Sequence, residues 1–187
     1  NMPLDMVTPI MRSRAKAVNF GIVYGIGAFS LAKDIGVSNK EAKHYIESYL
    51  AHYSGVDSYM KNVVEKANAD GYVETMFGRR RNLPELTSSK HMIRAFGERV
   101  ARNMPIQGTA ADIIKIAMIK VDERMKAENL RARLVLQVHD ELIVEAPQDE
   151  SMRVALIVQE EMENAVKMSV PLTADAAIGR TWYDAKG

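Results

Sequence analysis

Cysteine is absent from all 187 residues of the chain, and no apolar run approaches the ~20 residues that a membrane-spanning helix requires. The first absence excludes disulfides and thiolate metal sites, and the second predicts that the chain does not enter a membrane. Charge of one sign is also lacking, because 25 Lys and Arg face 24 Asp and Glu, so any polyanion-binding signal must be local. With 47% hydrophobic residues and neither repeats nor low-complexity segments, the composition is typical of a soluble globular protein of one or two small domains.

Helix signals dominate the first half of the chain. Thr8 before Pro9 predicts a helix start, and the pattern continues to about Gly25. Ser38 and Glu41 form a capping box that opens a second helix. We predict helices over about residues 9–25, 39–53, 56–70 and 88–103, the last broken near Pro105 and Gly108, with a short strand and a basic loop at 72–86.

The second half mixes a helix with antiparallel strands. Thr109 and Asp112 are expected to cap a long helix whose core face carries Ile113, Ile116, Ala117 and Val121. The period then changes from about 3.6 to 2, which predicts two buried strands, ARLVLQV and LIVEA, joined by a polar HDE turn. Asp149 is expected to cap a helix reaching about Met168, and VPLTADAAIG to form a last strand. The predicted fold class is α+β.

The first helix carries a stripe of two cations and two aromatic rings: Arg12, Lys16, Phe20 and Tyr24. At a four-residue spacing these side chains form one slanting line roughly 18 Å long. The free N–H groups and dipole of a helix N-terminus favour anions, so basic residues there suit a chain of phosphates. The rings beyond suit a sugar or a base, and a nucleotide has its parts in that order.

A simpler interpretation of the stripe stays open, in which Phe20 and Tyr24 are ordinary core and the two cations a solvated face. Spacing alone does not choose between the two. The glycines at 21, 25 and 27 do not form a G-x-G-x-x-G pattern and follow no strand, which excludes a dinucleotide-binding fold.

The hairpin QVHDELIVE is a second candidate site. A carboxylate at the tip between two strands is held rigidly, as a ligand for a hard cation such as Mg²⁺ must be. Asp140 is the first candidate ligand and Glu141 a weaker one, whereas plain turn residues would explain both equally well. A structural role is the commoner one for His139.

Basic residues concentrate in a third region of the chain. Three arginines at 79–81 are followed by Lys90, Arg94, Arg99 and Arg102. A polyanion backbone selects such a local concentration, although Glu85 and Glu98 are interspersed in it. The pattern slightly favours nucleic acid over a solvated surface.

Taken together, these stretches resemble the polymerase region of a family A, polymerase I type, DNA polymerase. The stripe with Gly21 and Gly25 is similar to motif B on the mobile fingers helix, and Val138-His139-Asp140-Glu141 is similar to motif C in the palm. Two further stretches, GYVETMFGRRR and ERVARNMPIQGTAADIIK, resemble the family at matching places. The resemblance covers the whole chain. It implies a helical fingers portion over residues 1–90, and a palm portion over 91–187 with a small antiparallel sheet packed on long helices.

The resemblance also implies residue roles. Arg12 and Lys16 would bind the triphosphate of a dNTP, Phe20 would pack on its sugar and base, and Tyr24 would stand by the template base. Asp140 would hold the catalytic Mg²⁺ pair, with Glu141 beside it. The implied primer-template contacts are Arg79, Arg80, Arg81, Arg99, Asn103, Gln107, Gln137 and His139.

The implied reaction is transfer of a nucleotide to a primer 3′-hydroxyl by two metal ions, with Arg12 and Lys16 neutralising phosphate charge. The implied setting is a monomer in a bacterial cytoplasm, associated with the nucleoid. Two departures from the family pattern stand out. Ser13 occupies a place where many members have a second Arg, and motif A, which supplies another palm carboxylate, is absent. We therefore expect the chain to be a fragment that works with an upstream part of the same polymerase and is inactive alone.

Two other functions remain open at this point. One is a non-catalytic module that binds duplex DNA, and the other is a relative of the single-subunit RNA polymerases, which resemble this chain in the Lys-to-Tyr spacing and the His-Asp pair. Phe20 and the QVHDE and QGTAAD contexts favour DNA synthesis.

Overall fold

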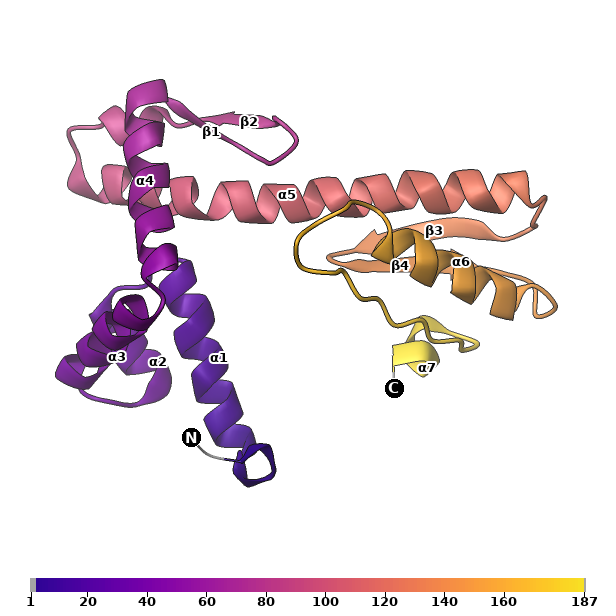
Figure 1. Ribbon diagram of the computed structural model, residues 1–187, viewed down its shortest axis with the longest axis horizontal. Coiled ribbons are helices and arrows are strands. Elements are labelled where there is room, and N and C mark those ends of the chain that lie inside the picture. Colours follow the sequence, from indigo (N-terminus) through magenta and orange to yellow (C-terminus); the bar gives the residue numbers. More distant parts are fainter. Residues whose placement is uncertain (1–2, 187) are drawn as a thin grey trace. The chain divides into compact units, whose positions relative to one another are not determined.

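The computed structural model describes residues 3–186 and divides into two compact units, the first ending at Gln107 and the second beginning at Gly108. The predicted boundary between fingers and palm at residues 90 and 91 stays a prediction. The first unit contains a short 3-10 helix η1 (Leu4–Met6), α1 (Pro9–Val23), α2 (Ala28–Ile35), α3 (Asn39–His52), α4 (Ser54–Asp70), strands β1 (Tyr72–Glu74) and β2 (Arg80–Asn82), and η2 (Pro84–Thr87). Helix α5 (His91–Ala127) follows (Figure 1), and then β3 (Arg133–Val138), β4 (Glu141–Glu145), α6 (Ser151–Glu163) and α7 (Trp182–Lys186). The α+β class is confirmed.

Local capping chemistry sets the helix boundaries that the sequence predicted well. The Thr8 hydroxyl accepts a hydrogen bond from the Met11 amide at 3.2 Å and starts α1. At α3, the Ser38 hydroxyl accepts from the Glu41 amide, and the Glu41 carboxylate accepts from the Ser38 amide at 2.9 Å. Gly71, in the left-handed conformation, ends α4 after Asp70, where the predicted helix also ends. These bonds satisfy backbone groups that every helix end leaves open.

The first unit has two separate apolar cores. One joins α2 and α3 through Leu31, Ala32, Ile35 and Ala42, with Ala17 and Val18 of α1 packed against it. The other joins α4, β1, η2 and the start of α5 through Ala67, Val73, Leu83, Leu86 and Ala101. Helix α2 was not predicted, because we took the glycines at 25 and 27 only as the end of the preceding helix.

The second unit is built on one core in which α5 and α6 cover one face of the β3–β4 hairpin. Val121 and Met125 of α5 meet Val154 and Ile157 of α6, and Leu134, Leu142 and Val144 pack against them from the strands. Of the face predicted to be core in this part of α5, Ala117 and Val121 are buried.

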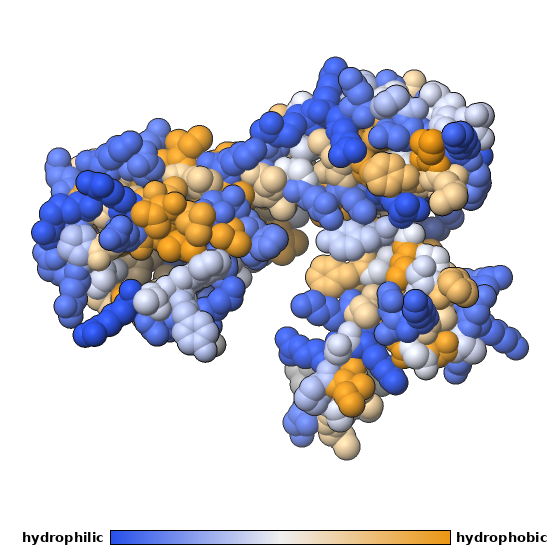
Figure 2. Space-filling view, turned by 180° about the vertical axis from the view of Figure 1, so that it is seen from behind, coloured by the Kyte–Doolittle hydropathy of each residue, from blue (hydrophilic) through white to orange (hydrophobic). Residues whose placement is uncertain are grey.

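The expectation that both strands of the hairpin are buried is wrong for much of β3. Leu136 pairs with Ile143 outside the core and is 46% exposed, and neighbouring Val135 is also exposed. Figure 2 shows hydrophobic side chains gathered on one face of this unit, at the left of the view. A two-stranded sheet has two faces, and the helices described here cover only one.

The predicted helix break near Pro105 and Gly108 is wrong, since α5 continues through both. An internal proline removes one backbone hydrogen bond and costs ~3 kcal/mol. Ala101, one turn before the proline, and Thr109, one turn after it, are both buried, and this packing offsets the loss. Thr109 and Asp112, predicted as caps, therefore lie buried inside the helix.

Two expectations for the end of the chain are also wrong. Helix α6 ends at Glu163 rather than near Met168, and Asp149 does not cap it but forms an ion pair with Arg131. VPLTADAAIG is not a strand, because no described segment pairs with it. A strand needs a partner in a ladder of backbone hydrogen bonds. In this segment the Ala174 amide instead donates to the Glu163 side-chain carboxylate at 3.1 Å.

The basic stretch after Gly78, expected as a loop, is partly strand β2.

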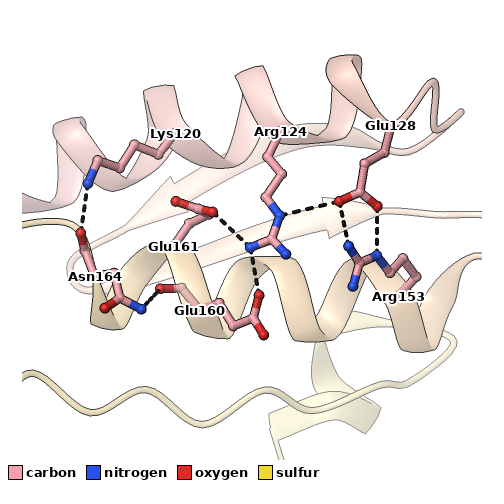
Figure 3. A network of polar contacts seen from close by, with 7 residues as sticks. All are labelled: Lys120, Arg124, Glu128, Arg153, Glu160, Glu161 and Asn164. Carbon is pink, nitrogen blue, oxygen red and sulfur yellow. Dashed lines mark hydrogen bonds and ion pairs between the residues drawn. The ribbon is translucent and has the colours of Figure 1, made fainter.

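Charged side chains hold α6 against the C-terminal half of α5 (Figure 3). Arg124 of α5 reaches Glu160 at 2.6 Å and Glu161 at 2.8 Å, while Arg153 of α6 contacts Glu128 at 2.5 Å. Lys120 donates to the main-chain oxygen of Asn164 at 2.7 Å, near the end of α6. The hydrogen bonds that Arg124 donates to Glu161 and Glu160 raise the pKa of Arg124, which therefore stays charged.

This network makes stability depend on pH through Glu128. Its hydrogen bonds, from Arg153 first and then Arg124, hold the pKa of Glu128 below its usual 4.5. A carboxylate with a lowered folded-state pKa adds stability above its unfolded pKa, and this stability is lost as the pH falls through the folded value. We expect Arg153→Met to lower the thermal midpoint by about 2–4 °C at pH 7 and by progressively less as the pH falls toward 3. Thermal melts between pH 3 and 7 test this, with exposed Arg133→Met as the matched control; a deficit that is constant across pH would contradict it.

Candidate nucleotide and nucleic-acid site

The stripe predicted on the first helix lies on the exposed face of α1. Arg12 and Lys16 are exposed, and Phe20 and Tyr24 remain 46% and 37% exposed. The Lys16 ammonium lies 5.8 Å from the centre of the Phe20 ring, and the rings of Phe20 and Tyr24 stack with centroids 6.0 Å apart. The interpretation of both rings as ordinary core is therefore wrong, because Ala17 and Val18 make the contact of α1 with its core.

The two cations lie in the N-terminal half of α1, and Arg12 lies in its first turn, where a positive charge is unfavourable to the helix dipole. No acidic side chain lies in that turn to offset it. An anion bound there would meet both the free N–H groups and the cations. The stripe thus offers charge at one end and flat apolar surface at the other.

The second unit presents Asp140 at the tip of the β3–β4 hairpin. Val138 pairs with Glu141, so His139 and Asp140 form a two-residue turn in which His139 has a positive φ of 54°. The Gln137 side chain donates to the His139 oxygen at 2.6 Å and braces the turn. The Asp140 carboxylate is exposed and makes no hydrogen bond or ion pair within residues 3–186.

Glu141 is less available than Asp140. It begins β4, and its carboxylate lies 3.3 Å from the Lys186 ammonium of α7. Sequence reasoning missed Lys186 as its partner because 45 residues separate the two. Among the described residues, no group of three or more His, Asp and Glu could hold a metal ion. Asp140, a free hard-oxygen donor on a braced turn, fits as one ligand of a Mg²⁺ site completed by other groups.

The predicted DNA contacts of the first unit lie on the β1–β2 hairpin and on α5. Arg80 stacks over the Tyr72 ring at 4.4 Å and pairs with Glu74 at 3.2 Å, and Arg79 and Arg81 are exposed beside it. Arg99, Asn103 and Gln107 follow one another on α5 at four-residue intervals.

These three residues of α5 differ in their surroundings. Arg99 lies 5.9 Å over the ring of Phe96, Gln107 is exposed, and Asn103 is half-buried. The side-chain oxygen of Asn103 is buried and has no hydrogen-bond partner among residues 3–186. Such a group is costly to leave unpaired and is common where function needs it.

No helix among the described residues combines the length and apolarity needed to cross a membrane.

Comparisons with known proteins agree on one family. The sequence model described as "DNA polymerase family A" matches residues 1–184. The chain is 56% identical over 182 residues to DNA polymerase I of Bacillus caldotenax and 54% identical over 180 residues to DNA polymerase I of Geobacillus stearothermophilus. These matches cover 97% and 96% of this chain but only 21% and 20% of the relatives. Among solved structures, the POL domain of Pol1 from M. smegmatis, in complex with DNA primer-template and dNTP, is similar with a TM-score of 0.95 and 46% identity, over 100% of this chain and 33% of that one.

Proposed function

Because this chain belongs to DNA polymerase family A, we propose that it forms the part of a DNA polymerase that binds the incoming nucleotide and presents one metal-binding carboxylate. The observation that carries this proposal is the exposed stripe on α1, where Lys16 lies 5.8 Å from the Phe20 ring and Phe20 stacks on Tyr24. Arg12 and Lys16 hold the triphosphate, Phe20 packs on the sugar and base, and Tyr24 stands by the template base. The relatives reported above are DNA polymerases, which favours DNA synthesis over the RNA polymerase alternative.

In the proposed reaction this chain supplies positioning and charge. When bound, a Mg²⁺ pair would activate the primer hydroxyl and stabilise the leaving pyrophosphate. Asp140 would hold that pair together with carboxylate groups from the upstream part of the polymerase, and Glu141 would lie beside it. The ammonium of Lys16 and the guanidinium of Arg12 neutralise negative charge on the triphosphate. Without them, electrostatic repulsion would hold the triphosphate away from the primer end.

The primer-template is proposed to contact residues that carry exposed polar groups on both units. Arg79, Arg80 and Arg81 lie along its backbone, where contacts fix register without reading sequence. Arg99, Asn103 and Gln107 meet the duplex near the primer end, and the unpaired oxygen of Asn103 supports such a contact. Gln137 and His139 complete the proposed contacts next to Asp140.

The chain spans about a fifth of the length of the relatives it matches, so we propose that an upstream polymerase segment completes the site. The exposed Val135 and Leu136 of β3 support this, since burying water-facing apolar side chains of that size is stabilising. The assembled polymerase is proposed to act as a monomer in a bacterial cytoplasm, on nucleoid DNA.

A chimera tests the proposed function. This chain replaces the matching 180 residues of Geobacillus stearothermophilus DNA polymerase I, to which it is 54% identical. We expect the chimera to extend a primer with dNTP and Mg²⁺, and the isolated 187-residue chain not to. A chimera that is folded and binds duplex DNA, with an affinity that falls steeply with salt, but extends no primer would instead indicate a non-catalytic binding module.

A further inference from the structure

The C-terminal turn of α1 lies against one arginine of α5 that the proposed function does not use. Gly25 follows the C-cap residue Tyr24 and has a φ of +76°, a conformation that a side chain disfavours. A Cβ built on Gly25 would lie 3.2 Å from Nη1 of Arg102 and 3.6 Å from its Cδ, with Cγ of Arg99 next at 3.9 Å. The guanidinium and stem of Arg102 therefore occupy the space beside this turn.

Arg102 is fixed on its own helix while it supports α1. Its side chain is only 23% exposed, and its Nη2 lies 3.5 Å from Glu98 one turn earlier on α5. A helix C-terminus carries partial negative charge on its free carbonyl groups, so a cation placed there is favourable. Arg102 meets that requirement for α1 from a different helix.

An open groove lies on this side of the turn. This groove has a volume of about 270 Å³ and is lined by Ile22, Gly25 and Ile26 of the turn, by Arg102, and by residues of α3 and α4, namely Ile46, Leu50, Asp57, Met60 and Lys61. Atoms that line an open groove have fewer packing contacts than atoms in a filled core. The Tyr24–Gly25 turn thus depends on Arg102 for its position more than a turn in a filled core would.

We propose that Arg102 is a positioning residue that sets the C-terminal turn of α1, and with it the rings of Tyr24 and Phe20, for nucleotide binding. Only the part of this inference that concerns nucleotide binding rests on the proposed function. Without Arg102 the turn would open more often, and the fraction of molecules with the rings in place would fall. The apparent dissociation constant for a ligand rises in inverse proportion to that fraction.

Hydrogen exchange in the isolated chain tests the structural half without any activity. The amides of Tyr24, Gly25 and Ile26 donate to Phe20, Ile22 and Gly21 at 2.8–2.9 Å, so they report on opening of this turn. We expect Arg102→Ala to speed their exchange by about 5- to 10-fold. The exposed Lys115→Ala, on the same helix, should leave it unchanged. Unchanged exchange in Arg102→Ala overturns the inference, whatever the chimera does.

Steady-state kinetics in the chimera test the functional half. We expect Arg102→Ala to raise KM for dNTP about 5-fold with kcat within about 2-fold, and Arg102→Lys, which keeps the stem and the charge, to restore most of the affinity. A residue that only stabilised the fold would lower the active fraction and hence the apparent kcat, with KM unchanged, and that result overturns the inference. If the unsubstituted chimera extends no primer, the proposed function is wrong. The hydrogen-exchange result then still tests whether Arg102 positions the turn.

Pairing Gly25→Ala with Arg102→Ala adds an internal check. Gly25→Ala introduces backbone strain at φ +76° in both backgrounds, so the strain cancels in the double-mutant cycle. The contact with Arg102 does not cancel. We expect Gly25→Ala to speed exchange less when Arg102 is already alanine, and equal effects in both backgrounds would contradict the contact.

Discussion

Replacing Asp140 with asparagine in the chimera is expected to lower the rate of primer extension by at least ~10³-fold. Asparagine keeps the size of the side chain but removes the negative charge that a hard cation requires. Because the Asp140 carboxylate is exposed and makes no bond within residues 3–186, the substitution should not disturb the hairpin. Single-turnover primer extension with saturating dNTP measures the effect directly.

Two controls give this result its meaning. Asp175→Asn removes an equally exposed aspartate from the same unit and should leave extension unchanged. Affinity of Asp140→Asn for duplex DNA should remain within about 3-fold of the parent, because one uncharged side chain replaces a group that repels phosphate. Parallel losses of extension, duplex affinity and thermal midpoint would instead indicate misfolding. Extension at the parent rate would exclude Asp140 from the metal site.

Glu141 should behave differently from its neighbour. Its carboxylate already lies 3.3 Å from the Lys186 ammonium, so part of its charge is neutralised within the unit. The identity of the two carboxylates as candidates came from the sequence, since a polar HDE between two apolar strands marks a hairpin tip. The ion pair of Glu141 with Lys186 supports ranking Asp140 above Glu141 as a metal ligand, and no local sequence pattern could reveal that partner.

Local chemistry explains which parts of the fold were predictable. The Thr8 cap and the Ser38–Glu41 capping box act within one helical turn, so the residues that decide these boundaries are adjacent in the sequence. The break expected at Pro105 failed because burial on both sides of the proline outweighs the lost bond. Such packing depends on residues from other helices and strands, which spacing does not identify.

The candidate site was likewise predictable from the sequence only in its local features. Four-residue spacing placed Lys16, Phe20 and Tyr24 on one side of a helix, but it could not say whether that side faces the core. The answer came from α2, an unpredicted helix that packs on the opposite side of α1 through Leu31 and Ala32. Arg102 was visible in the sequence only as one more basic residue, because its contact with Gly25 spans most of the first unit.

Lys16 offers the second large effect, because it stands between the phosphate end and the ring end of the stripe. Replacing Lys16 with glutamine in the chimera is expected to lower kcat/KM for dNTP by about 10²- to 10³-fold, through loss of a charge that acts on the transferring phosphates. Pre-steady-state incorporation at varied dNTP concentration measures this. Lys33→Gln, which removes an exposed lysine from α2, is the matched control and should change nothing.

The alternative for Lys16 is a general electrostatic contribution to DNA binding, and the two roles predict different losses. A triphosphate ligand loses affinity for dNTP far more than for the primer-template, whereas a general contribution weakens primer-template binding and reduces its salt dependence. The position of Lys16 favours the first role. Its ammonium lies 5.8 Å from the ring of Phe20, so a nucleotide whose phosphate is held by Lys16 can place its sugar or base on that ring. Equal loss of affinity for dNTP and for duplex DNA would remove Lys16 from the nucleotide site.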